Sequence, residues 1–251
     1  MPNSEHTENP TAQLENRAIG ALIGLACGDA IGAAVEFMPR GSFIPVTDMR
    51  GGGLHGIPAG YWTDDTSMAL ALLHSLIERG GFDASHQMEQ YCTWWQEGKY
   101  SSTGDCFDIG GQTRSALERF QRTNNPFAGS TAAAHAGNGS LMRLAPIAIF
   151  YHGSLPDTIM YAAESSRTTH GTTACVDACK VFSAMLHHAI EGQSKQAVLA
   201  SADFLLPNTS TLIADIVSGS YRNKKRMQIS SSGYVVHTLE AALWCFYHSQ
   251  S

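Results

Sequence analysis

The residues best suited to chemistry stand together at Thr63, Asp64 and Asp65, within the segment YWTDDTSM. This segment precedes a strongly periodic apolar stretch that predicts a helix from about Asp65 to Arg79. The first residues of a helix are not yet fully helical, so two carboxylates and a hydroxyl can converge on one ion. A site made only of oxygen atoms favours Mg²⁺ or Mn²⁺ over zinc. The alternative is an ordinary N-cap, because Asp and Thr are preferred capping residues.

Three other segments carry residues with chemical potential. Glu36 follows GDAIG in an apolar setting and is either a hydrogen-bonded structural residue or a general base with a shifted pKa. The loop Gly137–Ser140 opens into a predicted helix, where backbone N–H groups can cradle a phosphate. His170 leads into another predicted helix, and a lone histidine is more often structural. Neither of the glycine motifs of Rossmann and P-loop nucleotide sites is present.

These residues must be positioned by helices, because the apolar periodicity is helical nearly throughout and strand-like alternation is hard to find. The first predicted helix runs from Leu14 to Cys27 and stops at Gly28-Asp29. The others are predicted at 87–96, 113–122, 141–151, 156–166, 172–191, 195–206, 210–217 and 235–248. We therefore expect an all-α fold: a polar N-terminal tail over residues 1–13 and one helical domain over 14–251. Glycine-rich loops carried on these helices would hold the site.

The composition limits the classes of partner and compartment. A hydrophobic fraction of 43% with 15% charged residues is typical of a globular domain. The formal net charge of -6 argues against a broad electrostatic grip on nucleic acid or anionic lipid. We find no uninterrupted apolar stretch that is long enough to cross a bilayer, and the polar start resembles no secretory signal. We therefore expect a cytoplasmic protein without a membrane or nucleic-acid partner, and reduced cysteines.

Taken in order, the segments resemble the motifs of the ADP-ribosylglycohydrolase family. The matching segments are GDAIG with Glu36, WTDDTSM at 62–68, CFDIG at 106–110, GNGSLMR at 137–143 and the pair Thr169-His170. The resemblance extends from about residue 15 to residue 245. It implies an all-α fold with a binuclear Mg²⁺ or Mn²⁺ site, and hydrolysis of the glycosidic bond between ADP-ribose and an acceptor such as an arginine side chain. It also favours the metal site over the N-cap at Asp64-Asp65.

The resemblance assigns a role to each matching residue. Thr63, Asp64 and Asp65 would be metal ligands, and Glu36 would lie beside the metals as an acid/base or gating residue. Asp108 and Gly110 would line the reacting end. The diphosphate and ribose of ADP-ribose would be held by Gly137, Asn138, Gly139, Ser140 and His170.

One departure from the family pattern concerns the late DxD[ST] motif, which has no counterpart after Met142. The resemblance thus implies a domain without the usual C-terminal metal-ligand segment, either naturally short or incomplete. Three readings stay open: a metal-dependent hydrolase, an inactive member that binds ADP-ribose or a partner protein without turnover, and an enzyme completed by another chain. The missing helices would uncover apolar surface on the segment 235–246 and favour self-association. The acceptor could be arginine, serine or a small molecule.

Overall fold

The computed structural model describes residues 9–250 and confirms the all-α fold. Three isolated β-bridges are the only sheet-like pairings within those residues. The α-helices are α1 (Pro10–Gly32), α2 (Asp64–Arg79), α3 (Ala84–Glu97), α4 (Gly111–Thr123), α5 (Ala145–Phe150), α6 (Leu155–Thr169), α7 (Thr173–Ile190), α8 (Lys195–Ala200), α9 (Thr211–Val217) and α10 (Val235–His248). Short 3-10 segments are η1 (Ala33–Val35), η2 (Ala133–His135), η3 (Asp203–Asn208) and η4 (Arg226–Gln228).

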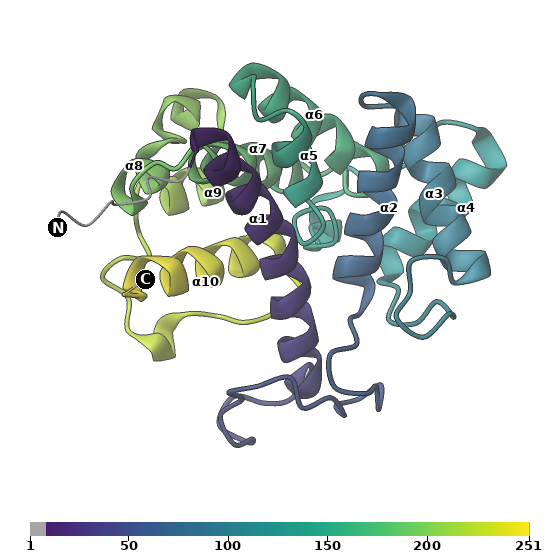
Figure 1. Cartoon of the computed structure of the whole chain (residues 1–251), viewed down its shortest axis with the longest axis horizontal. Coiled ribbons are helices and arrows are strands. Elements are labelled where there is room, and N and C mark those ends of the chain that lie inside the picture. Colours follow the sequence, from purple (N-terminus) through teal and green to yellow (C-terminus); the bar gives the residue numbers. More distant parts are fainter. Residues whose placement is uncertain (1–8, 251) are drawn as a thin grey trace, which may run out of the picture.

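The helices form two groups with α1 between them (Figure 1). Helices α2, α3 and α4 gather on one side, and α8, α9 and α10 on the other. Helix α7 packs against α5, α6, α8, α9 and α10, so it is the centre of the bundle. The long connection between α1 and α2 runs along one end of the molecule and joins the lower ends of those two helices (Figure 1).

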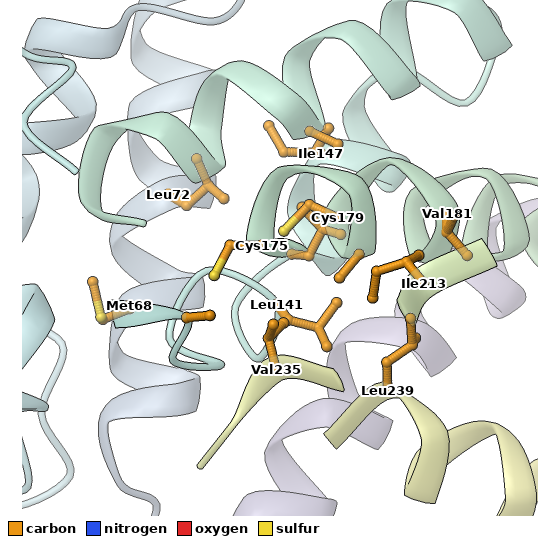
Figure 2. Packing of buried hydrophobic residues seen from close by; sticks show 14 of the residues in the cluster. Met68, Leu72, Leu141, Ile147, Cys175, Cys179, Val181, Ile213, Val235 and Leu239 are labelled. Atoms are coloured by element: carbon orange, nitrogen blue, oxygen red, sulfur yellow. The ribbon is translucent and has the colours of Figure 1, made fainter. Parts of the chain in front are cut away.

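The apolar core surrounds α7 (Figure 2). Cys175, Cys179 and Val181 of α7 are fully buried, and they lie among apolar side chains from α2, α5, α9 and α10. The cysteines of the described residues are all free, as expected, and burial raises the pKa of the Cys175 thiol to about 12. The α7 cysteines therefore act as small apolar core residues.

The first helix is longer at both ends than the periodicity predicts. Asn9 caps it by accepting a hydrogen bond from the Thr11 N–H, and Pro10 occupies the first turn. Residues 10–13 of the expected tail are therefore helical, while residues 1–8 lie outside the described part of the chain. The helix also continues through Gly28 to Gly32. A glycine within a helix costs only about 1 kcal/mol, which does not end a helix whose following turn packs against the protein.

Two other predicted helices differ in the structure. Pro146 lies at the start of α5, so residues 141–143 form turns rather than the predicted first turn of a helix. The predicted helix 195–206 is split into α8 and η3, and Pro207 lies within η3. The proline disfavours a regular helix beyond Leu206, whereas nothing in the structure explains the break at residues 201–202.

Helix α1 has an unusually exposed apolar face. Ile19 and Ile23 are 60% and 55% exposed, and Gly20, Gly24 and Gly28 are also exposed beside them. By length and composition alone, residues 10–35 are apolar enough to cross a membrane, contrary to the expectation from sequence. Core helices pass the same test, and α1 packs against α2, α5 and α7. The absence of a membrane partner stays a prediction.

The start of α2 is capped by a residue of α1. The Asp29 carboxylate accepts hydrogen bonds from the backbone N–H and hydroxyl of Thr63, and from the backbone N–H and hydroxyl of Thr66. The four donors lie 2.6–3.0 Å from the Asp29 oxygens. Asp29 therefore does the work of an N-cap side chain, and Asp64 and Asp65 are not needed for it.

We expect Asp29→Ala to destabilise the protein by at least about 2 kcal/mol, because it leaves two backbone donors and two hydroxyls of the α2 terminus without their acceptor. Urea unfolding followed by circular dichroism measures this loss. Asp83→Ala is the matched control, since Asp83 caps α3 through one hydrogen bond from the His86 N–H. Equal losses for the two variants would contradict the capping role of Asp29.

Candidate active site

Five acidic side chains from four segments gather around the start of α2. They are Asp29, Glu36, Asp64, Asp65 and Asp108, and each lies close enough to others of the group to affect their pKa values. Within residues 9–250, the one basic side chain paired with any of them is His55. The structure thus brings together the predicted residues Glu36, Asp64, Asp65 and Asp108, in a cluster that no lysine or arginine neutralises.

Burial makes the Asp64-Asp65 pair costly to ionise. Burial, and then the neighbouring Asp65, raise the pKa of Asp64 well above its ordinary value. Burial, and then Asp29, raise the pKa of Asp65 to about 7. Hydrogen bonds to the Asp64 side chain and to its own backbone N–H offset only part of this cost for Asp65, and no lysine or arginine in residues 9–250 pairs with either carboxylate, so a bound divalent ion would remove the repulsion between them.

The oxygen atoms at the start of α2 fit a hard divalent cation. The Thr63 hydroxyl gives its proton to Asp29, which leaves the lone pairs of its oxygen available beside Asp64 and Asp65. Two carboxylates and a hydroxyl, all held at one helix start, are the oxygen ligands that Mg²⁺ and Mn²⁺ prefer. Thr63, Asp64 and Asp65 would be the residues that hold such an ion.

Glu36 and Asp108 form the second part of the acidic cluster. Burial, and then the Asp108 charge, raise the pKa of Glu36 to about 7. Burial also raises the pKa of Asp108, which has a positive φ of 59° in the loop before α4. Gly110 is the exposed N-cap residue of α4, two positions further along the chain. With a pKa of about 7, the Glu36 carboxyl group can both give and accept a proton at neutral pH.

Sequence reasoning missed His55 as a site residue. Its Nε2 atom lies 3.1 Å from Asp108 Oδ1 and 3.9 Å from Glu36 Oε2. His55 stands in a glycine-rich loop, RGGGLHG, and no recognised motif marks it. The only signal in the sequence was that cluster of glycines just before the YWTDDTSM segment.

The predicted phosphate loop packs directly on His170. An added Cβ at Gly139 would lie 2.6 Å from His170 Cε1, and one at Gly137 would lie 3.3 Å from Nε2, so only glycine fits at Gly139 without displacing the ring. Burial, and then Arg143, lower the pKa of His170 to about 3, so the ring is neutral. The Ser140 hydroxyl is buried and accepts a hydrogen bond from Ser166. The His170 ring and the Ser140 hydroxyl therefore hold the loop in place through contacts on its buried side.

A buried arginine places a positive charge on the interior side of the loop Gly137–Ser140. Arg143 is fully buried and donates hydrogen bonds to the carbonyl oxygens of Gly139 and Ser165, and its guanidinium lies over the Tyr91 ring. It forms no ion pair with any acidic group in the described residues. A buried cation without an ion pair, close to a glycine loop that is partly exposed at Gly137 and Asn138, favours an anion such as a diphosphate. Arg143 is the last residue of the GNGSLMR segment, and its role depends on its burial, which the sequence pattern does not indicate.

A cavity of about 460 Å³ opens beside the glycine loop. Its lining comes from the start of α4, from η2 with the residues after it, and from the segment before α10. The Asn138 N–H donates to the Gly233 carbonyl, and the Val235 N–H to the Ala136 carbonyl, so the loop is fixed against that segment. The lining residues are Gln112, Ala133, Ala134, His135, Ala136, Gly137, Gly233 and Tyr234.

The fold and site motifs agree with a match between residues 10–251 and the family model for ADP-ribosylglycohydrolase. The chain belongs to the ADP-ribosylglycohydrolase family. A solved structure described as an ADP-ribosylglycohydrolase-related protein complex superposes with a TM-score of 0.83 at 40% identity, over 95% of this chain and 78% of that chain.

Three relatives narrow the position of the chain within the family. It is 44% identical to ADP-ribosylarginine hydrolase Tri1 of Pseudomonas putida (strain GB-1), over 95% of this chain and 63% of the relative. It is 40% identical to ADP-ribosylarginine hydrolase Tri1 of Serratia proteamaculans (strain 568), over 96% of this chain and 65% of the relative. The ADP-ribosyl-[dinitrogen reductase] glycohydrolase of Rhodospirillum rubrum is 30% identical, over 93% of this chain and 75% of the relative. The chain thus spans less than two thirds of the length of the two arginine hydrolases.

The raised pKa of Asp65 predicts how the stability of the metal-free protein depends on pH. Folding raises this pKa from 3.8 to about 7, so between these values the folded state binds more protons than the unfolded state. The contribution of Asp65 to stability is present below about pH 4 and is lost as the pH rises to 7. In EDTA, we expect Asp65→Asn to melt several degrees above the wild type at pH 8, and this advantage to vanish near pH 4.

Thermal unfolding followed by circular dichroism measures this difference. Comparing the variant with the wild type is necessary, because His170 has a lowered pKa and changes the stability in the opposite direction. Asp105→Asn, at an exposed aspartate, is the control and should follow the wild type at every pH. A metal-free wild type more stable than Asp65→Asn at pH 8 would be inconsistent with the repulsion described here.

Proposed function

We propose that this chain hydrolyses the bond between ADP-ribose and an arginine side chain, with Mg²⁺ or Mn²⁺ held by Thr63, Asp64 and Asp65. The observation that carries the proposal is the adjacent Asp64-Asp65 pair, of which Asp64 is buried and Asp65 partly so, at a helix start that Asp29 caps and without a basic partner among residues 9–250. The names of the two most similar relatives described above support arginine as the acceptor. The cytoplasmic location and the lack of a nucleic-acid partner stay predictions.

The acidic cluster suits the chemistry of glycoside hydrolysis, which passes through a positively charged, oxocarbenium-like state. A bound divalent ion supplies Lewis acidity for water and fixes the ribose hydroxyls. Glu36, with a pKa of about 7, would give a proton to the leaving guanidine or take one from the attacking water. Asp108, beside Glu36, would accept hydrogen bonds from the guanidinium N–H groups before the bond breaks.

The glycine loop suits the other half of the substrate. Backbone N–H groups of Gly137–Ser140 other than that of Asn138, which is bonded to Gly233, would bind the diphosphate, and the buried Arg143 would strengthen that contact through its charge. The neighbouring cavity of about 460 Å³ is within the size range of small-molecule sites and would take the adenosine. Neutral His170 would hold the loop backbone in place without adding charge.

The proposal predicts release of free ADP-ribose from ADP-ribosylated arginine when Mg²⁺ or Mn²⁺ is present, measured by liquid chromatography. We expect Asp65→Asn to lower the rate by at least about a hundredfold, because it removes one of the metal ligands. Asp105→Asn should keep the wild-type rate. Absence of release at high enzyme concentration would defeat the proposed activity.

Calorimetry with ADP-ribose separates the proposed enzyme from the alternative, a member of the family that binds without turnover. Metal-independent binding of ADP-ribose together with no hydrolysis would support that alternative. The shorter length of this chain relative to the arginine hydrolases is the reason to make this measurement.

Gly139→Ala tests the phosphate loop. The new Cβ would lie 2.6 Å from the His170 ring and force the loop or the ring to move, so we expect ADP-ribose to bind at least about tenfold more weakly. Gly153→Ala is the matched control, because an added Cβ at this exposed glycine meets no atom within 4 Å. Unchanged ADP-ribose affinity in Gly139→Ala, measured by calorimetry, would show that the loop does not contact the ligand.

A further inference from the structure

Three side chains that are far apart in the sequence converge beside the oxygen site. Glu36 follows η1, His55 stands in the glycine-rich loop, and Asp108 stands in the loop before α4. One potential ligand atom from each lies within 4.8 Å of the other two. His55 Nε2 is buried and has no hydrogen-bond partner, although it lies 3.1 Å from Asp108 Oδ1. The nitrogen is thus directed into the cluster without a satisfied hydrogen bond.

We propose that Glu36, His55 and Asp108 form a second divalent-metal site, with mixed nitrogen and oxygen ligands, that takes Zn²⁺ or a similar transition-metal ion in preference to Mg²⁺. Imidazole is a good ligand for zinc, nickel and copper, whereas Mg²⁺ favours oxygen ligands and keeps several waters. The Thr63, Asp64 and Asp65 set contains oxygen only, so the two sites differ in the metal they select.

The distances agree with ligation of one ion. Ligand atoms about 2.1 Å from a metal lie about 3.0 Å apart in adjacent octahedral positions and about 3.4 Å apart in a tetrahedron. The separation of His55 Nε2 from Asp108 Oδ1 is 3.1 Å, and that from Glu36 Oε2 is 3.9 Å. Small side-chain rotations are enough to bring all three atoms to one ion.

The loop that carries His55 is held rigidly against the residues before Glu36. Gly53 has a positive φ of 69°, and a Cβ at this position would lie 2.2 Å from the Ala33 carbonyl oxygen. The Gly52 N–H donates to the Ile57 carbonyl at 2.7 Å, which closes the turn around His55. The His55 ring also packs at 5.4 Å from the Phe107 ring, next to Asp108. His55 is therefore positioned by backbone and ring packing before any ion binds.

Occupation of this site has a consequence for the proposed hydrolase activity. An ion bound there holds the carboxylates of Glu36 and Asp108, so neither group is free to exchange a proton or to receive the guanidinium. Zn²⁺ should thus inhibit hydrolysis that Mg²⁺ supports. This consequence rests on the proposed function, whereas binding of the ion does not.

Titration of the full chain with Co²⁺ and Zn²⁺ tests the proposal without an activity measurement. Millimolar Mg²⁺ is kept present to occupy the oxygen site, Co²⁺ is followed by its visible absorption, and Zn²⁺ by calorimetry. We expect one Zn²⁺ per chain, and at least a tenfold weaker affinity in His55→Ala and in Asp108→Asn. Circular dichroism of each metal-free variant checks that it is folded, and Asp108→Asn serves if His55→Ala does not fold.

His74→Ala is the matched control. His74 Nε2 lies 2.7 Å from Glu78, whose carboxylate also lies 3.5 Å from His86 Nε2, so His74 represents an alternative place where Zn²⁺ could meet imidazole and carboxylate. This variant should bind Zn²⁺ like the wild type. The proposal is overturned if no Zn²⁺ binds in the presence of Mg²⁺, if His55→Ala and Asp108→Asn bind it unchanged, or if the affinity is lost only in His74→Ala or only in Asp65→Asn.

Discussion

The hydrogen bonds from the α2 terminus to Asp29 are the interaction on which the site depends. A helix start has unpaired N–H groups, and nearby acidic side chains ordinarily satisfy them. Here the acceptor comes from α1, across 34 residues of sequence, and it takes the backbone and hydroxyl donors of both Thr63 and Thr66. Because Asp29 meets most of that need from outside the helix, Asp64 and Asp65, apart from a bond of Asp65 to its own N–H, keep oxygen atoms for another partner. The result is a pair of acids at the start of a helix, Asp64 buried and Asp65 partly so, with raised pKa values and no basic neighbour in the part of the chain that the structure describes.

A second charged region complements the first. The glycine loop covers the buried, unpaired cation of Arg143 and a neutral His170, while the acids gather at the start of α2. A ligand with a negatively charged diphosphate at one end and a positively charged guanidinium at the other matches this separation of charge. The proposed substrate has that form, and the family relationship gives independent support to it.

Local sequence patterns predicted the elements well where tertiary contacts did not intervene. The last helix, 235–248, was predicted with the boundaries that the structure shows, and the helix beginning near Asp65 differs by one residue. The end of the first helix was predicted wrongly, because Gly28 and Asp29 are residue types that often end a helix. Asp29 instead points its carboxylate at a distant helix while α1 continues. Periodicity carries no information about such a contact.

The site residues also fall into two groups: those that the local sequence indicates, and those whose role depends on tertiary contacts. Asp64, Asp65, Glu36 and the loop 137–140 stand in segments whose residue types indicate chemistry, and the structure brings the acids into one cluster. The roles of His55 and Arg143 depend on their positions in the fold. His55 stands in a loop that folds against η1, and Arg143 is buried next to the glycine loop.

The most direct test of the central claim is a crystal structure with Mn²⁺ and ADP-ribose, using anomalous scattering to locate the ion. The account predicts an anomalous peak bonded to oxygens of Asp64 and Asp65, with Asp29 still capping α2. Carboxylates of Asp64 and Asp65 bonded to the N–H groups of α2, with no peak beside them, would contradict it.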